Sequence, residues 1–402
     1  MMKRSYKFLL AAISSLVVPA AFAANTITIG MTDSQTGALN VDSTYLYHGA
    51  ELWRDNVNAA GGIKVGNKHY KVKFVSYDDQ SQGGRVQQLY TRLILQDKSN
   101  FLFGPYSSGL TATAAVISEQ YGKIMLDAGG AEAKTFELGN KYLFQVITPA
   151  DKYLSGAIAV LKKRNPHAKV AFVYADDPFS KAVVTAARKN AEAAGLKTVL
   201  NESYPPATTD FSAIINKVIS SGADALLGGG HYADGATLAR QLHDQKAGLK
   251  WVSLLVAPDS AQFKTLGAAA DGVSVPSQWE PQVKYKPQFG PTVAHFTKQY
   301  LAKYKVEPDY HAAMGYAQGL LLQHAIEQAG SIDRDKVAAK LNAMHVTTFF
   351  GGSKFATGAD DHGLQTAHDM VLAQWENKGG KLLKEMVWPT AAATAKPVYP
   401  IH

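Results

Sequence analysis

The sequence predicts an α/β fold made of two similar lobes, each with a mostly parallel sheet at its core. Short apolar, β-branched runs alternate with longer amphipathic runs from residue 26 onward, which is typical of βα units. The alternation pauses at Pro149 and Ala150 and then begins again, so two comparable blocks follow one another. The chain has 402 residues, 46% of them apolar, which is enough for two or three domains with their own cores.

The first block is predicted to alternate strands with helices. Gly61 follows its first helix, where glycine readily takes the left-handed conformation that ends a helix, and Ile63 can pack back against that helix. Strands are expected at 26–32, 71–77, 101–106, 123–126 and 143–148, and helices at 45–60, 84–98 and 108–121.

The second block repeats this alternation. Asp210 precedes one of its helices and can accept hydrogen bonds from the first N–H groups of that helix. Strands are expected at 169–175, 197–204, 224–230, 252–256 and 272–276, and helices at 151–163, 180–194, 211–221 and 232–247. Two further helices are expected at 289–304 and 311–329, and the tail from Thr347 carries short strand-like runs between pairs of glycines.

Residues 1–23 have the layout of a secretory signal peptide. Basic residues precede an apolar run over 8–18, which is too short to span a membrane, and Ala21-Phe22-Ala23 offers a cleavage site after Ala23. We therefore expect export to the periplasm. The rest of the formal net charge of +8 is scattered and lacks interleaved aromatic residues, so nucleic-acid binding is not expected.

Neither a metal nor a cofactor is predicted. The absence of cysteine excludes disulfides, thiolate metal sites and a lipid anchor on that residue. His362 and His368 are separated by five residues, a spacing that does not place two ligands on one helix face, and we expect both at the surface. The run Gly228-Gly229-Gly230 matches neither the register of a dinucleotide-binding loop nor the lysine of a nucleotide loop.

Ser107 and Ser108 lie where a predicted strand gives way to a predicted helix. The G-x-S-x-G order of a hydrolase nucleophile is absent around them. Ser108 then fits two interpretations, as part of an anion site at the helix N-terminus or as an ordinary N-cap. The residues alone leave both interpretations open.

Several short motifs of the chain resemble the leucine/isoleucine/valine-binding protein family, the type I periplasmic solute-binding proteins that feed ABC importers. The motifs are Gly49-Ala50-Glu51, Asn58-Ala59-Ala60-Gly61-Gly62-Ile63, Tyr77-Asp78-Asp79, Gly104-Pro105-Tyr106-Ser107-Ser108, Thr209-Asp210-Phe211, Gly228-Gly229-Gly230 and Gly351 through Phe355. The resemblance covers nearly all of 24–380.

This resemblance implies two Rossmann-like lobes with parallel-sheet cores, joined by three crossovers and enclosing a solute between them. The crossovers are expected near 147–149, 276–279 and 350–352. Lobe 1 would then comprise 24–147 and 278–350, and lobe 2 would comprise 148–277 and 351–402.

The resemblance also implies how an amino acid would be held. Ser108 and backbone groups of Gly129 and Ala131 would bind the carboxylate, while the carbonyl of Gly129 and the side chain of Asp259 would bind the ammonium. The residues expected to contact the solute are Ser107, Ser108, Gly129, Ala131, Phe179, His231, Asp259 and Asp42.

Three of these positions depart from the family pattern and indicate a changed ligand. Ala131 replaces a common threonine, Asp42 a common aromatic residue, and His231 a common tyrosine. The expected function is a non-enzymatic, monomeric periplasmic component of an ABC importer, which closes around a branched-chain-like or polar amino acid and docks on a permease in the inner membrane. The alternatives are an aromatic carboxylate or amide as the solute, a ligand sensor, or an exported hydrolase using Ser108 and His231.

Overall fold

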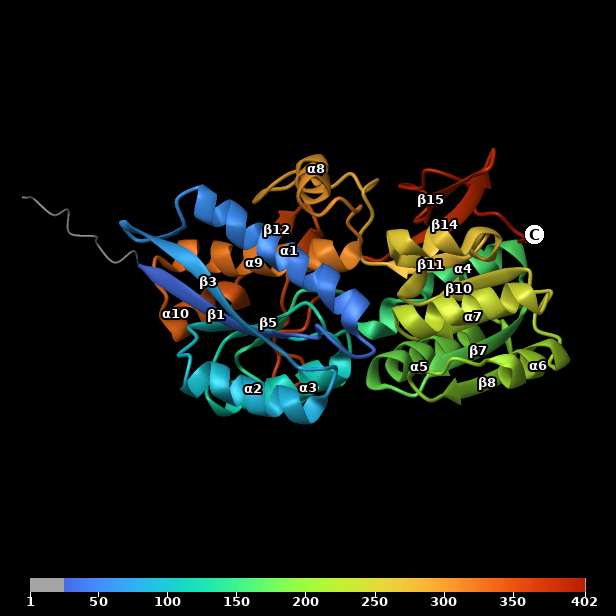
Figure 1. Cartoon of the computed structure of the whole chain (residues 1–402), viewed down its shortest axis with the longest axis horizontal. Helices are drawn as coiled ribbons and strands as arrows, with labels where there is room; N and C mark the ends of the chain where they lie inside the picture. The colour runs from blue at the N-terminus through green and yellow to red at the C-terminus, as the bar shows by residue number, and fades with distance from the viewer. Residues whose placement is uncertain (1–24, 402) are drawn as a thin grey trace, which may run out of the picture.

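The computed structural model describes residues 25–401, which form two lobes side by side (Figure 1). The predicted signal peptide, residues 1–23, lies outside these residues. Within the described part of the chain, no helix combines the length and the apolar character needed to cross a membrane.

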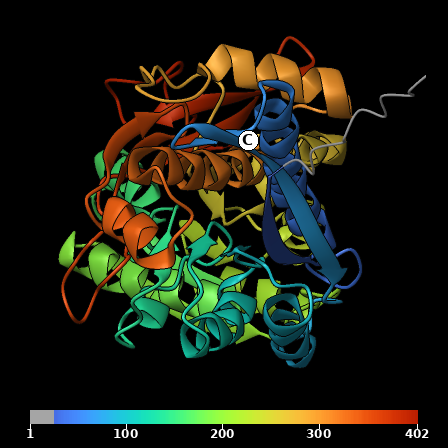
Figure 2. The same cartoon turned by 90° about the vertical axis from the view of Figure 1, so that its left-hand side faces the viewer.

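The first lobe contains a six-stranded sheet in the order β2-β3-β1-β4-β5-β6. All pairings in it are parallel except that of β2 with β3. Helices α2 and α3 lie on one side of this sheet and α1 and α9 on the other (Figure 2). Its elements are β1 (Thr26–Asp33), α1 (Asn40–Ala59), β2 (Ile63–Val65), β3 (Lys68–Asp78), α2 (Gly83–Leu95), β4 (Phe101–Phe103), α3 (Ser108–Gln120), β5 (Met125–Asp127), the 3-10 helix η1 (Ala133–Phe136), β6 (Leu143–Gln145), α8 (Val293–Tyr304), α9 (Tyr310–Ala329), α10 (Arg334–Asn342), β12 (His345–Thr348) and β13 (Gly351–Lys354).

The second lobe contains a seven-stranded sheet in the order β15-β14-β11-β10-β9-β7-β8. Strand β14 pairs antiparallel with both β11 and β15 at one end of it, whereas the remaining pairings are parallel. Its elements are η2 (Ala150–Lys152), α4 (Ser155–Arg164), β7 (Lys169–Ala175), α5 (Pro178–Ala193), β8 (Lys197–Tyr204), α6 (Ser212–Ser220), β9 (Ala225–Gly229), α7 (Tyr232–Asp244), β10 (Trp251–Leu254), η3 (Ala257–Asp259), η4 (Ala261–Ala270), β11 (Ser274–Ser277), β14 (Val371–Lys378) and β15 (Lys381–Trp388).

Both sheets are apolar on their two faces, as sheets covered by helices must be. In β4, Phe101 and Phe103 face the core beneath α1 and α9, while Leu102 faces α2 and α3. In β7, Val170 and Phe172 face one core and Ala171 and Val173 the other. This explains why the strands appear in the sequence as continuous apolar runs instead of alternating ones.

The predicted helix ends are confirmed at two positions. Gly61 has a φ of 108°, and Ile63 is fully buried. The carboxylate of Asp210 accepts a hydrogen bond of 2.9 Å from the Ser212 N–H at the start of α6. Strand β2 and helix α10 were not predicted, because the first is only three residues long and the second has no strong apolar periodicity.

The third crossover lies later than the expected 350–352. Strand β13 pairs with β12, and the Gln145 N–H donates to the carbonyl of Gly363, so residues 351–368 lie against the first lobe. The chain joins the second sheet only at β14, which pairs with β11. The short strand-like runs of the tail did not reveal which sheet each one would join.

Hydrogen bonds tie the three crossovers together. The side-chain oxygen of Gln278 accepts from the Thr148 N–H at 3.0 Å, and its amide donates to the Thr148 carbonyl at 3.2 Å. The Thr148 hydroxyl lies 2.7 Å from Nδ1 of His368, whose Nε2 lies 2.9 Å from the Phe350 carbonyl. His368 is therefore buried and not at the surface as expected, and burial lowers its pKa to about 4.

Helices α1 and α9 approach each other closely through small residues. A Cβ on Gly49 would collide with the Ala312 carbonyl, and one on Gly315 would collide with the Leu46 carbonyl. Glycine is needed at these positions because backbone packs directly against backbone.

We expect Gly315→Ala to lower the free energy of unfolding by about 1–3 kcal/mol, since the added methyl group must push the two helices apart. Gly84→Ala is the matched control, because its Cβ would meet no atom within 4 Å and alanine favours the helix. Chemical denaturation of both variants measures the difference. Equal midpoints would show that α1 and α9 tolerate separation.

We predict that the burial of His368 lowers the free energy of unfolding in acid. Its pKa is lowered in the folded state, so the stabilising contribution is present above the ordinary histidine pKa of about 6.5 and is lost as the pH falls toward 4. The full loss is on the order of 3 kcal/mol. We expect His368→Gln to flatten the dependence of unfolding free energy on pH in this window. His345→Gln, at an exposed position, should leave the dependence unchanged.

Candidate functional site

A small cavity of about 10 Å³, room for about one water molecule, lies between the lobes. It is surrounded by loops that follow the carboxyl ends of parallel strands, β4 and β5 in the first lobe and β7 and β9 in the second, which is where open α/β sheets bind ligands. Its lining residues are Tyr106, Ser107, Gly129, Ala131, Ile147, Tyr153, Phe179, His231, Tyr310 and Met314. Ser107, Gly129, Ala131, Phe179 and His231 were expected to contact a solute, and the structure brings them together here.

One end of this cavity is the N-terminus of α3. Ser107 is the N-cap residue of that helix, but its side chain forms no capping hydrogen bond. The first N–H groups of α3 and the Ser107 hydroxyl are therefore available to an anion, which the helix dipole also favours.

Ser108 has a different role from its neighbour. Its hydroxyl oxygen accepts hydrogen bonds from the N–H groups of Ala131 at 3.0 Å and Glu132 at 3.2 Å, and it does not line the cavity. The side chain thus joins the loop after β4 to the loop after β5. Neither of the two interpretations of Ser108 from sequence describes this arrangement.

Asp127 shapes the loop after β5. One carboxylate oxygen accepts from the N–H groups of Gly129 at 3.0 Å and Gly130 at 2.8 Å. Burial raises the pKa of this carboxyl to about 7, although these hydrogen bonds oppose the shift. A Cβ on Gly129 would collide with the Pro105 carbonyl, so only glycine lets the two loops of the cavity meet.

The remaining wall is largely aromatic. The Tyr106 hydroxyl lies 2.9 Å from Nδ1 of His231, which joins the two lobes across the cavity. The rings of Tyr153 and Phe179 pack edge to face with centroids 5.2 Å apart. Tyr106, Tyr153 and Tyr310 were not among the residues expected from sequence. Tyr106 directly precedes the serine pair, and this was the one signal that could have identified it.

Asp42 lies beside the cavity without lining it. It is on the first turn of α1, 2% exposed, and its carboxylate accepts from the Tyr232 N–H of the second lobe at 3.3 Å. Burial raises its pKa, while the nearby His311 and His231 lower it. The carboxylate thus bonds to a donor of the protein and does not line a pocket for the side chain of a solute.

The carboxylate of Asp259 also already has partners within the protein. The residue is fully buried, and its carboxylate accepts from the Tyr310 N–H at 2.9 Å and from the Lys384 ammonium at 3.1 Å. Lys384 also lies 3.0 Å from a carboxylate oxygen of Glu280. Burial alone would lower the pKa of Lys384, but the two carboxylates outweigh it and raise the pKa. Asp259 is therefore the partner of a lysine of the protein.

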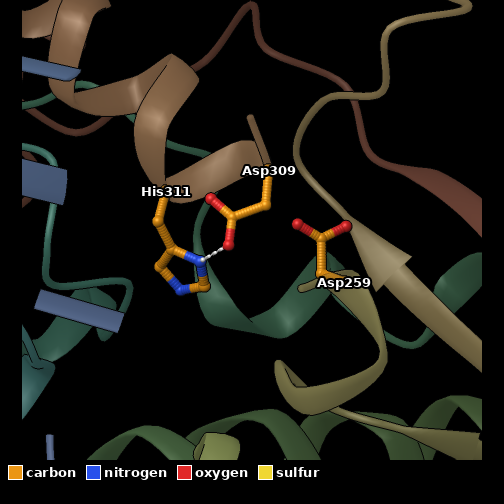
Figure 3. A group of neighbouring side chains, drawn as sticks. All are labelled: Asp259, Asp309 and His311. Atoms are coloured by element: carbon orange, nitrogen blue, oxygen red, sulfur yellow. Dashed lines mark hydrogen bonds and ion pairs between the residues drawn. The ribbon is translucent and has the colours of Figure 1, made fainter. Parts of the chain in front are cut away.

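Asp259, Asp309 and His311 have the composition of a metal site, because one potential ligand atom from each lies within 4.8 Å of the others (Figure 3). Their carboxylate oxygens and Nδ1 of His311 already have protein partners, whereas Nε2 of His311 is buried without one among the described residues. Asp309 accepts from the Ala312 N–H at 3.0 Å as the N-cap of α9, and its other oxygen lies 3.3 Å from His311 Nδ1. A metal ion would have to displace these contacts and compete with Lys384, which supplies the positive charge at this position.

Residues 26–381 match the profile of a family described as periplasmic binding protein. An amino acid binding protein of Pseudomonas aeruginosa is 26% identical over 377 residues, which are 92% of this chain and 95% of the relative. The substrate binding protein of a branched-chain amino acid transporter from Streptococcus pneumoniae, solved with isoleucine, is 22% identical with a TM-score of 0.76, and the match covers 90% of this chain and 99% of that one. A solute binding protein from Rhodopseudomonas palustris, solved with 3,4-dihydroxybenzoic acid, is 17% identical with a TM-score of 0.78, and the match covers 94% and 98%.

We expect Lys384→Met to lower the free energy of unfolding by about 3 kcal/mol or more, because Asp259 and Glu280 would remain buried without their cation. Lys381→Met is the control, since Lys381 is exposed on the same strand. Thermal and chemical denaturation of the two variants measure the difference. Equal stability would mean that the two carboxyls are protonated in the native protein.

Proposed function

Since the chain belongs to the family of periplasmic binding proteins, we propose that it is the solute-binding component of an ABC importer and binds a small aromatic carboxylate between its lobes. The family and the predicted type I fold of two lobes are confirmed. The match to binding proteins also confirms the prediction that the chain is not an enzyme. Export to the periplasm, the monomeric state and docking on an inner-membrane permease complete the proposal.

The observation that carries the choice of solute is the chemistry of the cavity wall. A carboxylate fits at the N-terminus of α3, where the Ser107 hydroxyl and backbone N–H groups lack a side-chain acceptor. The rest of the wall consists mainly of rings and apolar side chains, against which an aromatic ring packs well. No acidic side chain lines the cavity formed by residues 25–401, so an ammonium group would be buried there without a carboxylate partner.

Closure of the lobes would complete the site. Phe179 and His231 belong to the second lobe, whereas Ser107, Gly129 and Ala131 belong to the first. A solute held first by the first lobe gains contacts from the second only after closure, and such differential contacts can shift the equilibrium toward the closed form.

An amino acid is the second candidate. The relative from Pseudomonas aeruginosa is named an amino acid binding protein, and the streptococcal structure contains isoleucine. For this chain, an ammonium group would require Asp259 to release Lys384 or the Tyr310 N–H, or would be satisfied by backbone carbonyls alone.

The hydrolase alternative has less support. The Ser108 hydroxyl accepts two backbone N–H groups, and His231 Nδ1 contacts Tyr106. A nucleophilic serine needs a base within hydrogen-bond reach, and Ser108 has no such contact with His231 among the described hydrogen bonds.

Titration calorimetry of protein stripped of endogenous solute tests the proposal. We expect benzoate to bind and L-leucine to bind at least about ten-fold more weakly, because the ammonium group adds a buried charge without a partner. Ser107→Ala should weaken benzoate binding about ten-fold, the value of one hydrogen bond to a charged group.

Ser118→Ala is the matched control, since its hydroxyl bonds only to Ala115 at the far end of the same helix. Tight binding of leucine together with no binding of benzoate would replace the aromatic carboxylate by the amino acid. Turnover of either compound would contradict a pure binding protein.

A further inference from the structure

Several hydrogen bonds join the two lobes, and three of them lie beside the solute cavity. One joins the Tyr106 hydroxyl to His231 at 2.9 Å. The second runs from the Tyr232 N–H to Asp42 at 3.3 Å, and the third from the Tyr310 N–H to Asp259 at 2.9 Å. Each of these bonds has one partner in each lobe, so all three break when the lobes separate.

The second and third bonds join the same kinds of group, a carboxylate and a helix N-terminus, with the roles of the two lobes exchanged. Asp42 of the first lobe accepts from the first residue of α7 in the second lobe, and Asp259 of the second lobe accepts from the first residue of α9 in the first lobe. Each carboxylate therefore meets the positive N-terminal end of a helix that belongs to the other lobe.

Among the described hydrogen bonds, no side chain of α7 accepts the Tyr232 N–H that bonds to Asp42. Asp234 in its first turn accepts from the Gly235 N–H instead. His231 is its N-cap residue and makes no side-chain capping hydrogen bond. Asp42 also lies in the first turn of α1, so two helix N-termini face this one carboxylate. Both arrangements favour a negative charge at Asp42 and so oppose the burial that raises its pKa.

Neither carboxylate lines the solute cavity, whereas Tyr106 and His231 both do. Asp42 is 2% exposed and Asp259 is fully buried. A solute can therefore replace or perturb the contact between Tyr106 and His231, but it has no access to the two carboxylate contacts. These contacts depend only on whether the lobes are together.

We propose that Asp42 and Asp259 are positioning residues that form a reciprocal latch, which holds the lobes closed without any solute. The ligand-free protein then populates the closed form in part, and a solute that enters while the lobes are apart gains the same latch contacts when they close. Because apparent affinity scales with the population of the competent state, the latch sets affinity by the same factor for every solute. This inference does not depend on which solute the protein binds.

The test measures the distance between the lobes in ligand-free protein. The chain has no cysteine, so Gln87→Cys on α2 and Thr185→Cys on α5, both at exposed positions, allow two spin labels to be attached specifically. Double electron–electron resonance measures the distribution of distances between the two labels and so gives the proportions of closed and open forms. We expect a closed population in the parent protein and a closed-to-open ratio about ten-fold lower in Asp42→Ala, the loss of one charged hydrogen bond.

A second pair of variants removes the donor and keeps the carboxylate. Tyr232→Pro deletes the N–H that Asp42 accepts, and proline is well tolerated at the first position of a helix. Tyr232→Ala loses the same ring but retains the N–H. We expect the first variant to open the protein about as much as Asp42→Ala and the second to stay close to the parent.

Asp55→Ala controls for loss of an acidic residue from α1, because Asp55 pairs with Arg54 and Lys303 within the first lobe. Asp259→Asn tests the contact between Asp259 and the Tyr310 N–H and should also lower the closed population. An unchanged circular dichroism spectrum and cooperative melting show that each variant is folded. A parent protein that is fully open without solute would overturn the proposal. So would equal closed populations in Tyr232→Pro and Tyr232→Ala.

Discussion

Helix N-termini converge on the cleft of this protein, and their N–H groups need acceptors. The parallel sheets place the starts of α3, α5 and α7 around one space, because each of these helices follows a strand, and the start of α9, which follows α8, borders the same space. Asp177 caps α5 from within its own lobe, and Asp309 caps α9. Asp42 and Asp259 reach α7 and α9 from across the cleft, whereas α3 has no side-chain cap. The distribution of these acceptors defines both where a carboxylate solute can bind and what holds the lobes together.

Charged groups near the cleft are consequently satisfied by the protein. Asp259 is shared between a helix N–H and Lys384, and Glu280 lies on the other side of the same ammonium. Removing one member of such a buried group leaves another charge without a partner, which is costly. This explains why a residue of the type that could bind an ammonium group is not available to a solute in the closed form.

The crossovers are subject to a related constraint. Their backbone groups are buried between two lobes and must be paired, and the side chains of Gln278, Thr148 and His368 provide several of the partners. His368 was expected at the surface. Its burial depends on Thr148, 220 residues away, and on Phe350, and no local pattern encodes contacts of that kind.

The sequence by itself determined the alternation of strands and helices, the division into two blocks, the family and several loops of the cavity. These follow from local properties, namely apolar periodicity, the conformational freedom of glycine, and motifs such as that ending in Ser107 and Ser108. Only the tertiary structure decided that Ser107 faces the cavity while Ser108 ties two loops together, that Asp42 and Asp259 bond to opposite lobes, and that residues 351–368 lie with the first lobe. The reason is physical: each of these outcomes depends on which donor lies opposite a side chain after packing, and that donor comes from a distant part of the chain.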